Sequence, residues 1–226
     1  SMYFMQIVWG LRKEPFIGVR PLNHAKEAPT TGAWQFTNAI DSWSWQGYEG
    51  EKAVVEVYAN SASVRLLLNG KEIANKPVKK YKTLFKLPYQ PGTLTAEALD
   101  ERGNVISSHS LTTAGEETVL RVTPDKMVLC ANNQALCYLP IEFTDKAGNL
   151  KPYMEQRVEV AVAGAATLAG FGSALCKTNE VFDKPYHHSY RGRCLAVLRA
   201  GSTPGKAKVT VTSAGMEPVT IEVEVQ

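Results

Sequence analysis

Residues 52–73, KAVVEVYANSASVRLLLNGKEI, decide the fold of this chain. Their first half is rich in valine and carries a tyrosine, a composition typical of a β-strand. Their second half contains Asn69-Gly70 between two further strand-like stretches. Asn-Gly is the strongest short hairpin signal, because a type I′ turn needs a positive φ at both of its central positions. The stretch therefore predicts antiparallel strands joined by a tight turn.

Strand patterns continue on both sides of this stretch. Residues 80–87, KYKTLFKL, alternate between one face formed by Tyr81, Thr83, Phe85 and Leu87 and an opposite face of lysines. Such alternation predicts a half-buried strand. The lysines clustered in residues 69–86, NGKEIANKPVKKYKTLFK, are interpreted as the solvent-exposed side of one sheet rather than as a nucleic-acid site. Only residues 1–11 have apolar positions at helical spacing.

The strand pattern restarts after residues 114–117, AGEE, with residues 118–129, TVLRVTPDKMVL. Each half of the chain has about the size of one immunoglobulin-like sandwich, and short strands follow one another between turns. We therefore expect an all-β protein with two tandem immunoglobulin-like β-sandwich domains, residues 1–115 and residues 118–226.

The composition is that of a soluble globular protein. The 226 residues are 44% hydrophobic and 21% charged, and the net charge of +3 implies no particular partner. No apolar run approaches the roughly 20 residues of a membrane span, and the first residues lack the pattern of a signal peptide. We expect a cytoplasmic protein with no membrane and no nucleic-acid partner.

The four cysteines, Cys130, Cys137, Cys176 and Cys194, form no CxxC pair. A structural zinc site usually needs such pairs, so no metal is expected from them. Their even number leaves disulfides open as an alternative. We expect free buried thiols, which fit a reducing compartment.

Residues 41–50, DSWSWQGYEG, place Trp43 and Trp45 two positions apart. On an extended chain both indoles project from the same face. They are either an aromatic platform on which a sugar stacks or packing anchors in a core. Their position close to the first secure strand favours packing anchors.

No group of residues forms a catalytic constellation. Asn179-Glu180 resembles the acid/base pair of retaining glycosidases, but no second carboxylate is placed to act as the nucleophile, so Glu180 is interpreted as a solvated loop residue. His187-His188 lack a third metal ligand. We expect no catalytic residue and no metal.

Residues 182–193, FDKPYHHSYRGR, are the best candidate for a ligand site, because loops at sandwich ends commonly carry function. On a strand, Arg191 and Arg193 share a face and could bind a phosphate or carboxylate. The tyrosines could stack on a ring and a histidine could donate a hydrogen bond. The candidate residues are Tyr186, His187, His188, Tyr190, Arg191 and Arg193.

Residues 42–73 closely resemble the C-terminal β-sandwich module of family 2 glycoside hydrolases, the β-galactosidase and β-glucuronidase family. In that module a Trp-rich segment leads into a V-x-V-Y-x-N strand and a hairpin tipped by LNGK. The matching residues here are Val55, Val57, Tyr58, Asn60 and residues 68–71.

The second half resembles the next accessory domain of the same enzymes, through residues 141–150, 170–174, 190–201 and 204–218. Residues 3–16, YFMQIVWGLRKEPF, look like the chain leaving the last helix of the catalytic barrel. The resemblance covers nearly the whole chain.

The resemblance implies a non-catalytic C-terminal segment that supports the barrel of its own full-length chain and a homo-oligomer. The barrel and its two catalytic glutamates are absent, so no catalytic residue carries over and the fragment should be inactive. The resemblance also implies an alternative. Some related glucuronidases bind flavin mononucleotide in their C-terminal domains, so a module that binds a sugar or flavin mononucleotide is the second hypothesis, although no cofactor is the first expectation. In the first hypothesis, Arg191 and Arg193 pair with acidic neighbours and their loop packs against the barrel.

Overall fold

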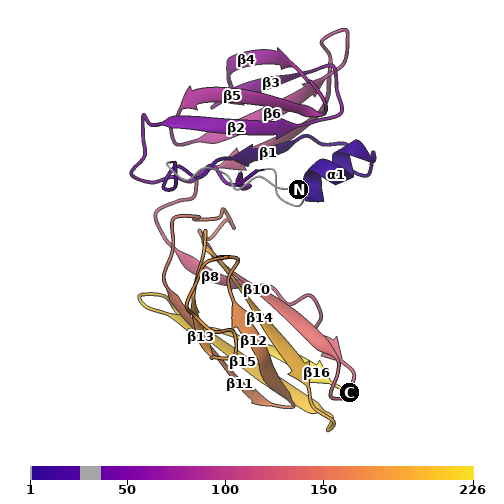
Figure 1. Cartoon of the computed structure of the whole chain (residues 1–226), viewed down its shortest axis with the longest axis vertical. Coiled ribbons are helices and arrows are strands. Elements are labelled where there is room, and N and C mark those ends of the chain that lie inside the picture. The colour runs from indigo at the N-terminus through magenta and orange to yellow at the C-terminus, as the bar shows by residue number, and fades with distance from the viewer. Residues whose placement is uncertain (1, 26–36) are drawn as a thin grey trace. The chain divides into compact units, whose positions relative to one another are not determined.

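A computed structural model of the chain describes residues 2–25 and 37–226. Apart from one short helix it is all-β, and it divides into two compact units, Ser1–Thr113 and Ala114–Gln226 (Figure 1). We call them the N-terminal unit and the C-terminal unit. Each unit contains two sheets, so the predicted all-β class with two sandwich-like domains is confirmed.

The N-terminal unit pairs a three-stranded sheet, in the order β1-β2-β5, with a four-stranded sheet, in the order β4-β3-β6-β7. All pairs are antiparallel. Its elements are α1 (Met2–Val8), β1 (Phe16–Val19), β2 (Lys52–Tyr58), β3 (Ser63–Leu68), β4 (Lys71–Pro77), β5 (Lys82–Pro88), β6 (Thr93–Leu99) and β7 (Val105–Thr112).

The core of this unit is formed by the inward faces of its strands, where residues alternate between buried and exposed along β3 and β5. The predicted hairpin is confirmed: Asn69 and Gly70 form the two-residue connection between β3 and β4, with φ of 52° and 78°. However, β4 and β5 are edge strands of different sheets. The sequence predicted that the lysines of residues 71–86 lie on one sheet. This prediction is wrong, because these lysines are divided between two sheets.

Helix α1 packs on Phe16 and Tyr58, which lie on β1 and β2. Its Ile7 is fully buried there, and the ring of Phe4 meets Tyr58 edge-on with centroids 5.4 Å apart. The helix ends at Val8, three residues before the predicted end of the helical pattern, and Leu11 is 74% exposed. The Tyr58 end of the outer face of β2 is consequently covered instead of facing solvent.

The C-terminal unit packs a sheet with the order β12-β14-β10-β8 on a sheet with the order β13-β11-β15-β16-β9. Pairing is antiparallel except between β9 and β16. Its strands are β8 (Val119–Val122), β9 (Val128–Leu129), β10 (Leu136–Thr144), β11 (Arg157–Gly164), β12 (Ala166–Gly172), β13 (Tyr186–His188), β14 (Arg193–Ala200), β15 (Gly205–Ser213) and β16 (Val219–Val225).

The first residues of the C-terminal unit are fixed to its body by two charged side chains. Asp145 accepts a hydrogen bond from the backbone N–H of Gly115 at 2.8 Å. Lys151 is only 1% exposed, and its Nζ donates to the carbonyl of Glu116 at 2.7 Å and to Thr118 Oγ1 at 2.8 Å. Burial lowers the pKa of Lys151, although nearby acidic residues oppose this shift. A buried ammonium group is tolerated only when such partners satisfy it.

All four cysteines are free thiols. Cys137 and Cys194 are buried, but Cys130 and Cys176 are exposed, so the expectation of buried thiols is wrong for two of them. Burial, together with the charge of Glu180, raises the pKa of Cys194 to about 12, so this thiol behaves as a small hydrophobic side chain.

Among the described residues no helix has the length and apolarity needed to cross a membrane.

Candidate functional site

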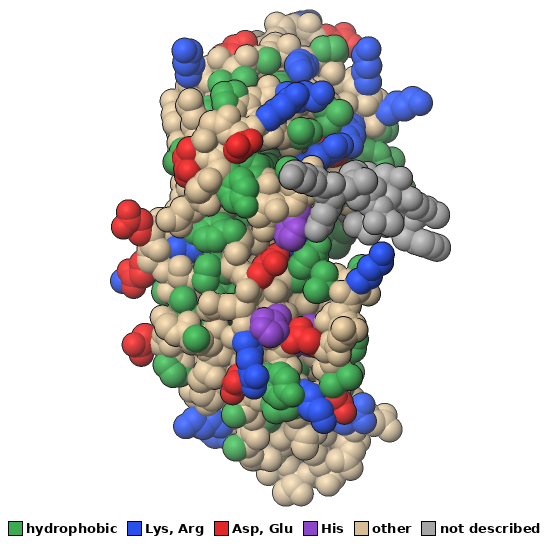
Figure 2. Space-filling view, turned by 60° about the vertical axis from the view of Figure 1, so that its left-hand side comes forward, with side chains coloured by type: hydrophobic (Ala, Val, Ile, Leu, Met, Phe, Trp, Pro, Cys, Tyr) green, Lys and Arg blue, Asp and Glu red, His purple; other side chains and the backbone are tan. Residues whose placement is uncertain are grey.

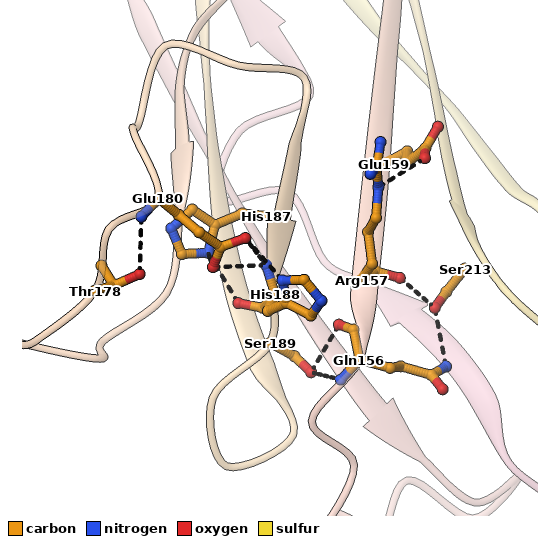
Figure 3. A network of polar contacts seen from close by, with 9 residues as sticks. All are labelled: Gln156, Arg157, Glu159, Thr178, Glu180, His187, His188, Ser189 and Ser213. Atoms are coloured by element: carbon orange, nitrogen blue, oxygen red, sulfur yellow. Dashed lines mark hydrogen bonds and ion pairs between the residues drawn. The ribbon is translucent and has the colours of Figure 1, made fainter.

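The loop that precedes β13 folds back onto the two histidines of that strand (Figure 3). Glu180 Oε1 lies 2.7 Å from His188 Nδ1, and Glu180 Oε2 lies 3.3 Å from His187 Nδ1. The backbone N–H of His188 also donates to Glu180 Oε1 at 3.2 Å. Glu180 is therefore not the solvated loop glutamate that the sequence suggested. Its carboxylate connects the loop to the edge of a sheet.

The electrostatics of Glu180 reflect these contacts. Partial burial raises its pKa, but the hydrogen bonds from the ring and the backbone of His188, with the charges of both histidines, hold the pKa below its usual value. The carboxylate stays ionised at neutral pH. It is an acceptor here, and an acid catalyst would need the opposite shift.

His187 is fully buried, whereas the neighbouring His188 is exposed, as expected for adjacent residues on a strand. The ring of Phe182 stacks on His187 with centroids 5.6 Å apart. Gly172 makes room for this stack, because a Cβ there would come within 2.3 Å of the Phe182 ring. Nε2 of His187 is buried without a hydrogen-bond partner among the described residues. Among residues 2–25 and 37–226, no three His, Cys, Asp or Glu side chains are grouped so that they could hold a metal ion.

The predicted arginine pair is not formed. Arg191 and Gly192 are the two central residues of a tight turn, with φ of 53° and 74°, and Tyr190 and Arg193 exchange backbone hydrogen bonds across it. Because the chain reverses between them, Arg191 and Arg193 do not share a strand face. Arg193 Nε instead pairs with Glu142 Oε1 at 2.9 Å.

The aromatic candidates are likewise engaged within the unit. The guanidinium group of Arg191 lies 4.9 Å from the centroid of the Tyr190 ring, and that of Arg157 lies 4.1 Å from the centroid of the Tyr186 ring. The structure thus brings His187 and His188 together around Glu180 and places Arg191 on Tyr190, whereas Tyr186 and Arg193 contact residues outside the predicted set.

Sequence reasoning missed several residues of this network. Ser189 is buried, and its hydroxyl donates to the carbonyl of Met154 at 2.8 Å while accepting from the backbone N–H of Gln156 at 3.0 Å. Glu180, Phe182 and Ser189 all stabilise the loop, and none belongs to a motif with a fixed spacing. The polar residues that flank the adjacent histidines were the only available signal.

Trp43 and Trp45 are both fully buried in the core of the N-terminal unit. Trp43 Nε1 donates to the carbonyl of Gln90 at 2.9 Å, and its ring meets Tyr89 edge-on at 4.9 Å. The hydroxyl of Tyr89 in turn accepts from the backbone N–H of Trp45 at 3.1 Å. A sugar platform needs an open ring face, which neither indole presents in this structure. Both act as packing anchors.

Comparisons with known proteins agree with this description. Residues 120–222 match the family described as Glycoside hydrolase family 2 C-terminal domain 5, and residues 50–107 match a domain of unknown function, DUF4982. Beta-galactosidase BoGH2A of Bacteroides ovatus is 29% identical over 195 residues, which are 85% of this chain and 23% of that enzyme.

Two solved structures are similar in fold to this chain over almost its whole length. A family 2 glycosyl hydrolase from Bacteroides cellulosilyticus is 26% identical with a TM-score of 0.86, covering 99% of this chain and 30% of its own. A β-glucuronidase from glycoside hydrolase family 2 shares the fold at 19% identity with a TM-score of 0.78, covering 99% of this chain and 21% of its own. This chain spans less than a third of each of these proteins. It therefore consists of accessory C-terminal domains of the glycoside hydrolase family 2.

Proposed function

We propose that this chain is the non-catalytic C-terminal segment of a β-galactosidase or β-glucuronidase, and that it supports the catalytic barrel of the same polypeptide. The matches to C-terminal domains of much longer enzymes support this proposal. The chemistry remains with the barrel. Retaining hydrolysis needs two carboxyl groups about 5 Å apart on a rigid frame, and neither the sequence nor the Glu180 network supplies such a pair.

The observation that carries the proposal is the outward face of α1. One face of this helix packs on Phe16 and Tyr58. However, Met2 at the start of the helix is 61% exposed, and Trp9, which directly follows the helix, is 66% exposed. The backbone N–H of Trp9 donates to the carbonyl of Met5, so the helical hydrogen-bond pattern extends to Trp9. Large apolar side chains that remain exposed on one helix and on the residue that follows it favour an interface with another part of the protein.

The test is the substitution Trp9→Ser with Leu11→Ser in the full-length enzyme and in this chain alone. In the full-length enzyme we expect a loss of about 2–4 kcal/mol from the docking of the barrel, because buried Trp residues dominate interfaces. This loss appears as a lower melting temperature and lower activity. In the isolated chain the melting temperature should not change, because both side chains are already exposed.

The matched control is Met127→Ser with Val128→Ser, which removes two exposed apolar side chains from the C-terminal unit. It should leave both proteins unaffected. A full-length enzyme whose stability and activity are the same with and without Trp9 and Leu11 would contradict a supporting role for this face.

A further inference from the structure

The turn between β4 and β5 has an unfavourable sequence for its conformation. Lys79 and Lys82 exchange two backbone hydrogen bonds of 3.1 Å, which closes a two-residue connection. Lys80 and Tyr81 both have positive φ, 50° and 63°. The two-residue turn between β3 and β4 of the same unit uses Asn69-Gly70, the pair best suited to this geometry. Side chains kept in such a conformation are a reason to look for a function at the turn.

A pocket of about 700 Å³ lies beside this turn. Its walls carry four lysines, Lys76, Lys79, Lys80 and Lys82. Its remaining surface is mainly apolar and includes Phe4, Pro77 and Leu84. The volume is in the range of pockets that bind small molecules, about 300–1,000 Å³. The pocket thus combines an apolar wall with a concentration of positive charge.

The positive charge of the whole chain is concentrated at this place. Residues 1–113 contain thirteen Lys and Arg against ten Asp and Glu, whereas residues 114–226 contain twelve of each. Within residues 71–88 there are six lysines and one glutamate. Blue Lys and Arg side chains are visible on the N-terminal unit in Figure 2, and others lie on the C-terminal unit. The charge excess therefore belongs to the β4–β5 region.

Two of the four lysines have partners within the unit. Lys82 Nζ lies 2.6 Å from Glu56 Oε2, and Lys76 Nζ donates to the carbonyl of Leu84 at 2.9 Å. Among the described residues none pairs with the ammonium groups of Lys79 and Lys80, which are exposed at the mouth of the pocket. These two cations are available to a ligand.

Lysines on edge strands also prevent pairing between sheets of different molecules. That role accounts for Lys71 and Lys86, which lie on the same two edge strands outside the pocket. It does not account for the apolar wall, nor for a turn that keeps Lys80 and Tyr81 at positive φ when an Asn-Gly pair would fit more easily.

We propose that the pocket beside the β4–β5 turn binds a small organic anion, whose carboxylate or phosphate lies between the ammonium groups of Lys79 and Lys80. The carbon skeleton of the ligand packs against Phe4, Pro77 and Leu84. Lys76 and Lys82 add to the positive potential without contacting the anion directly. Because the site is open to solvent, salt screens the attraction over roughly 8 Å at physiological ionic strength.

The experiment is calorimetric titration of this chain with three compounds that share a nitrophenyl ring: 4-nitrophenyl β-D-glucuronide, 4-nitrophenyl phosphate and 4-nitrophenyl β-D-galactoside. The first two carry a carboxylate and a phosphate, and the third is neutral. We expect the anions to bind at least tenfold more tightly than the galactoside, and to lose this advantage in 0.5 M NaCl. Binding of only one anion supports the proposal and identifies the head group.

Two double variants make the test specific for the pocket. Lys79→Gln with Lys80→Gln should weaken binding of the anions about tenfold or more. Lys71→Gln with Lys86→Gln removes the same charge from the two strands that flank the turn and should leave the affinity within twofold of the original. The proposal is overturned if neither anion binds at 10 mM, if the galactoside binds equally well, or if the two double variants behave alike. Circular dichroism of each variant checks that it folds.

Discussion

At the scale of single residues, Glu56 is the most unusual group in the molecule. Its side chain is fully buried, and its carboxylate contacts Lys82 at 2.6 Å, the hydroxyl of Tyr58 at 2.7 Å and Arg20 Nε at 2.8 Å. Burial raises the pKa of Glu56, but the hydrogen bonds from Lys82, Tyr58 and Arg20 outweigh burial and hold the pKa below its usual value. The ionised form is thus the one that the folded state favours.

Replacing Glu56 by Gln tests this conclusion. We expect Glu56→Gln to lower the free energy of unfolding by about 2–3 kcal/mol at pH 7, because hydrogen bonds to a charged group are lost. The folded pKa lies below the unfolded value of about 4.3, so the contribution of Glu56 is fully present above that value and is lost as the pH falls through the folded pKa. Urea unfolding from pH 7 to pH 3 should show the difference between the two proteins shrinking in acid.

Glu222→Gln is the control for this prediction. Glu222 pairs with Lys206 at 2.9 Å, but both side chains are largely exposed, so water replaces the lost contact. The Glu222→Gln protein should have the same free energy of unfolding as the original protein at pH 7. A Glu56→Gln protein that is equally stable, or whose deficit grows in acid, would show that the buried carboxylate does not stabilise the fold.

The sequence could not predict this residue. Alternation along β2 places Val55 and Val57 inward and Glu56 on the opposite face, which is normally solvated. Glu56 is buried there by partners that the alternation does not reveal: Arg20, which is distant in the sequence, Tyr58 and Lys82. The arginines of the candidate ligand loop illustrate a different limit. Their spacing of two is informative only on a strand, and Gly192 allows the chain to reverse between them.

At the scale of elements, the β3–β4 turn and the β4–β5 turn of the N-terminal unit differ in how well their residues suit them. Gly70 has a φ of 78°, and a Cβ added to it would have no heavy atom within 4 Å. A larger residue at this position is therefore disfavoured by the backbone conformation and not by lack of space. Tyr81 occupies the corresponding position of the β4–β5 turn at φ 63° with a full side chain. The sequence predicted the first turn because its residues suit it, and missed the second because they do not.

Substitutions at these two positions should therefore have opposite effects. Tyr81→Gly should raise the free energy of unfolding by about 0.5–1 kcal/mol, since relief of the left-handed conformation exceeds the added chain entropy. Gly70→Ala should lower it by about 1–2 kcal/mol. Guanidinium titrations of the two variants provide the measurement. A Tyr81→Gly protein less stable than the original would mean that contacts of the tyrosine ring matter more than its backbone.

At the scale of the whole molecule, each unit has its own hydrophobic core. Trp43 belongs to the core of the N-terminal unit, and Phe143 belongs to that of the C-terminal unit. The strand alternation and turn signals were sufficient to predict two sandwiches, because each sandwich is built only from strands of its own half of the chain. The exposed face of α1 was not predicted, since helical spacing placed Leu11 on the buried side.

Separate cores predict separable unfolding. Trp43→Ala and Phe143→Ala should each cost about 3–5 kcal/mol, but each should lower the melting temperature of a different transition in differential scanning calorimetry. Two-state behaviour is a property of single domains, so the intact chain is expected to show two overlapping transitions. If both variants shifted one shared transition by the same amount, the two units would unfold as one.

Lys151, the buried lysine that holds the first residues of the C-terminal unit, has a consequence for domain transplantation. A graft of this sandwich onto another protein that began at Thr118 would omit the carbonyl of Glu116, one of the two oxygens that hold Lys151 Nζ. The grafted domain would then bury the ammonium group of Lys151 with only one of its two hydrogen-bond acceptors present. One side chain thus sets the shortest portable version of the domain, which has to include the residues from Glu116 onward.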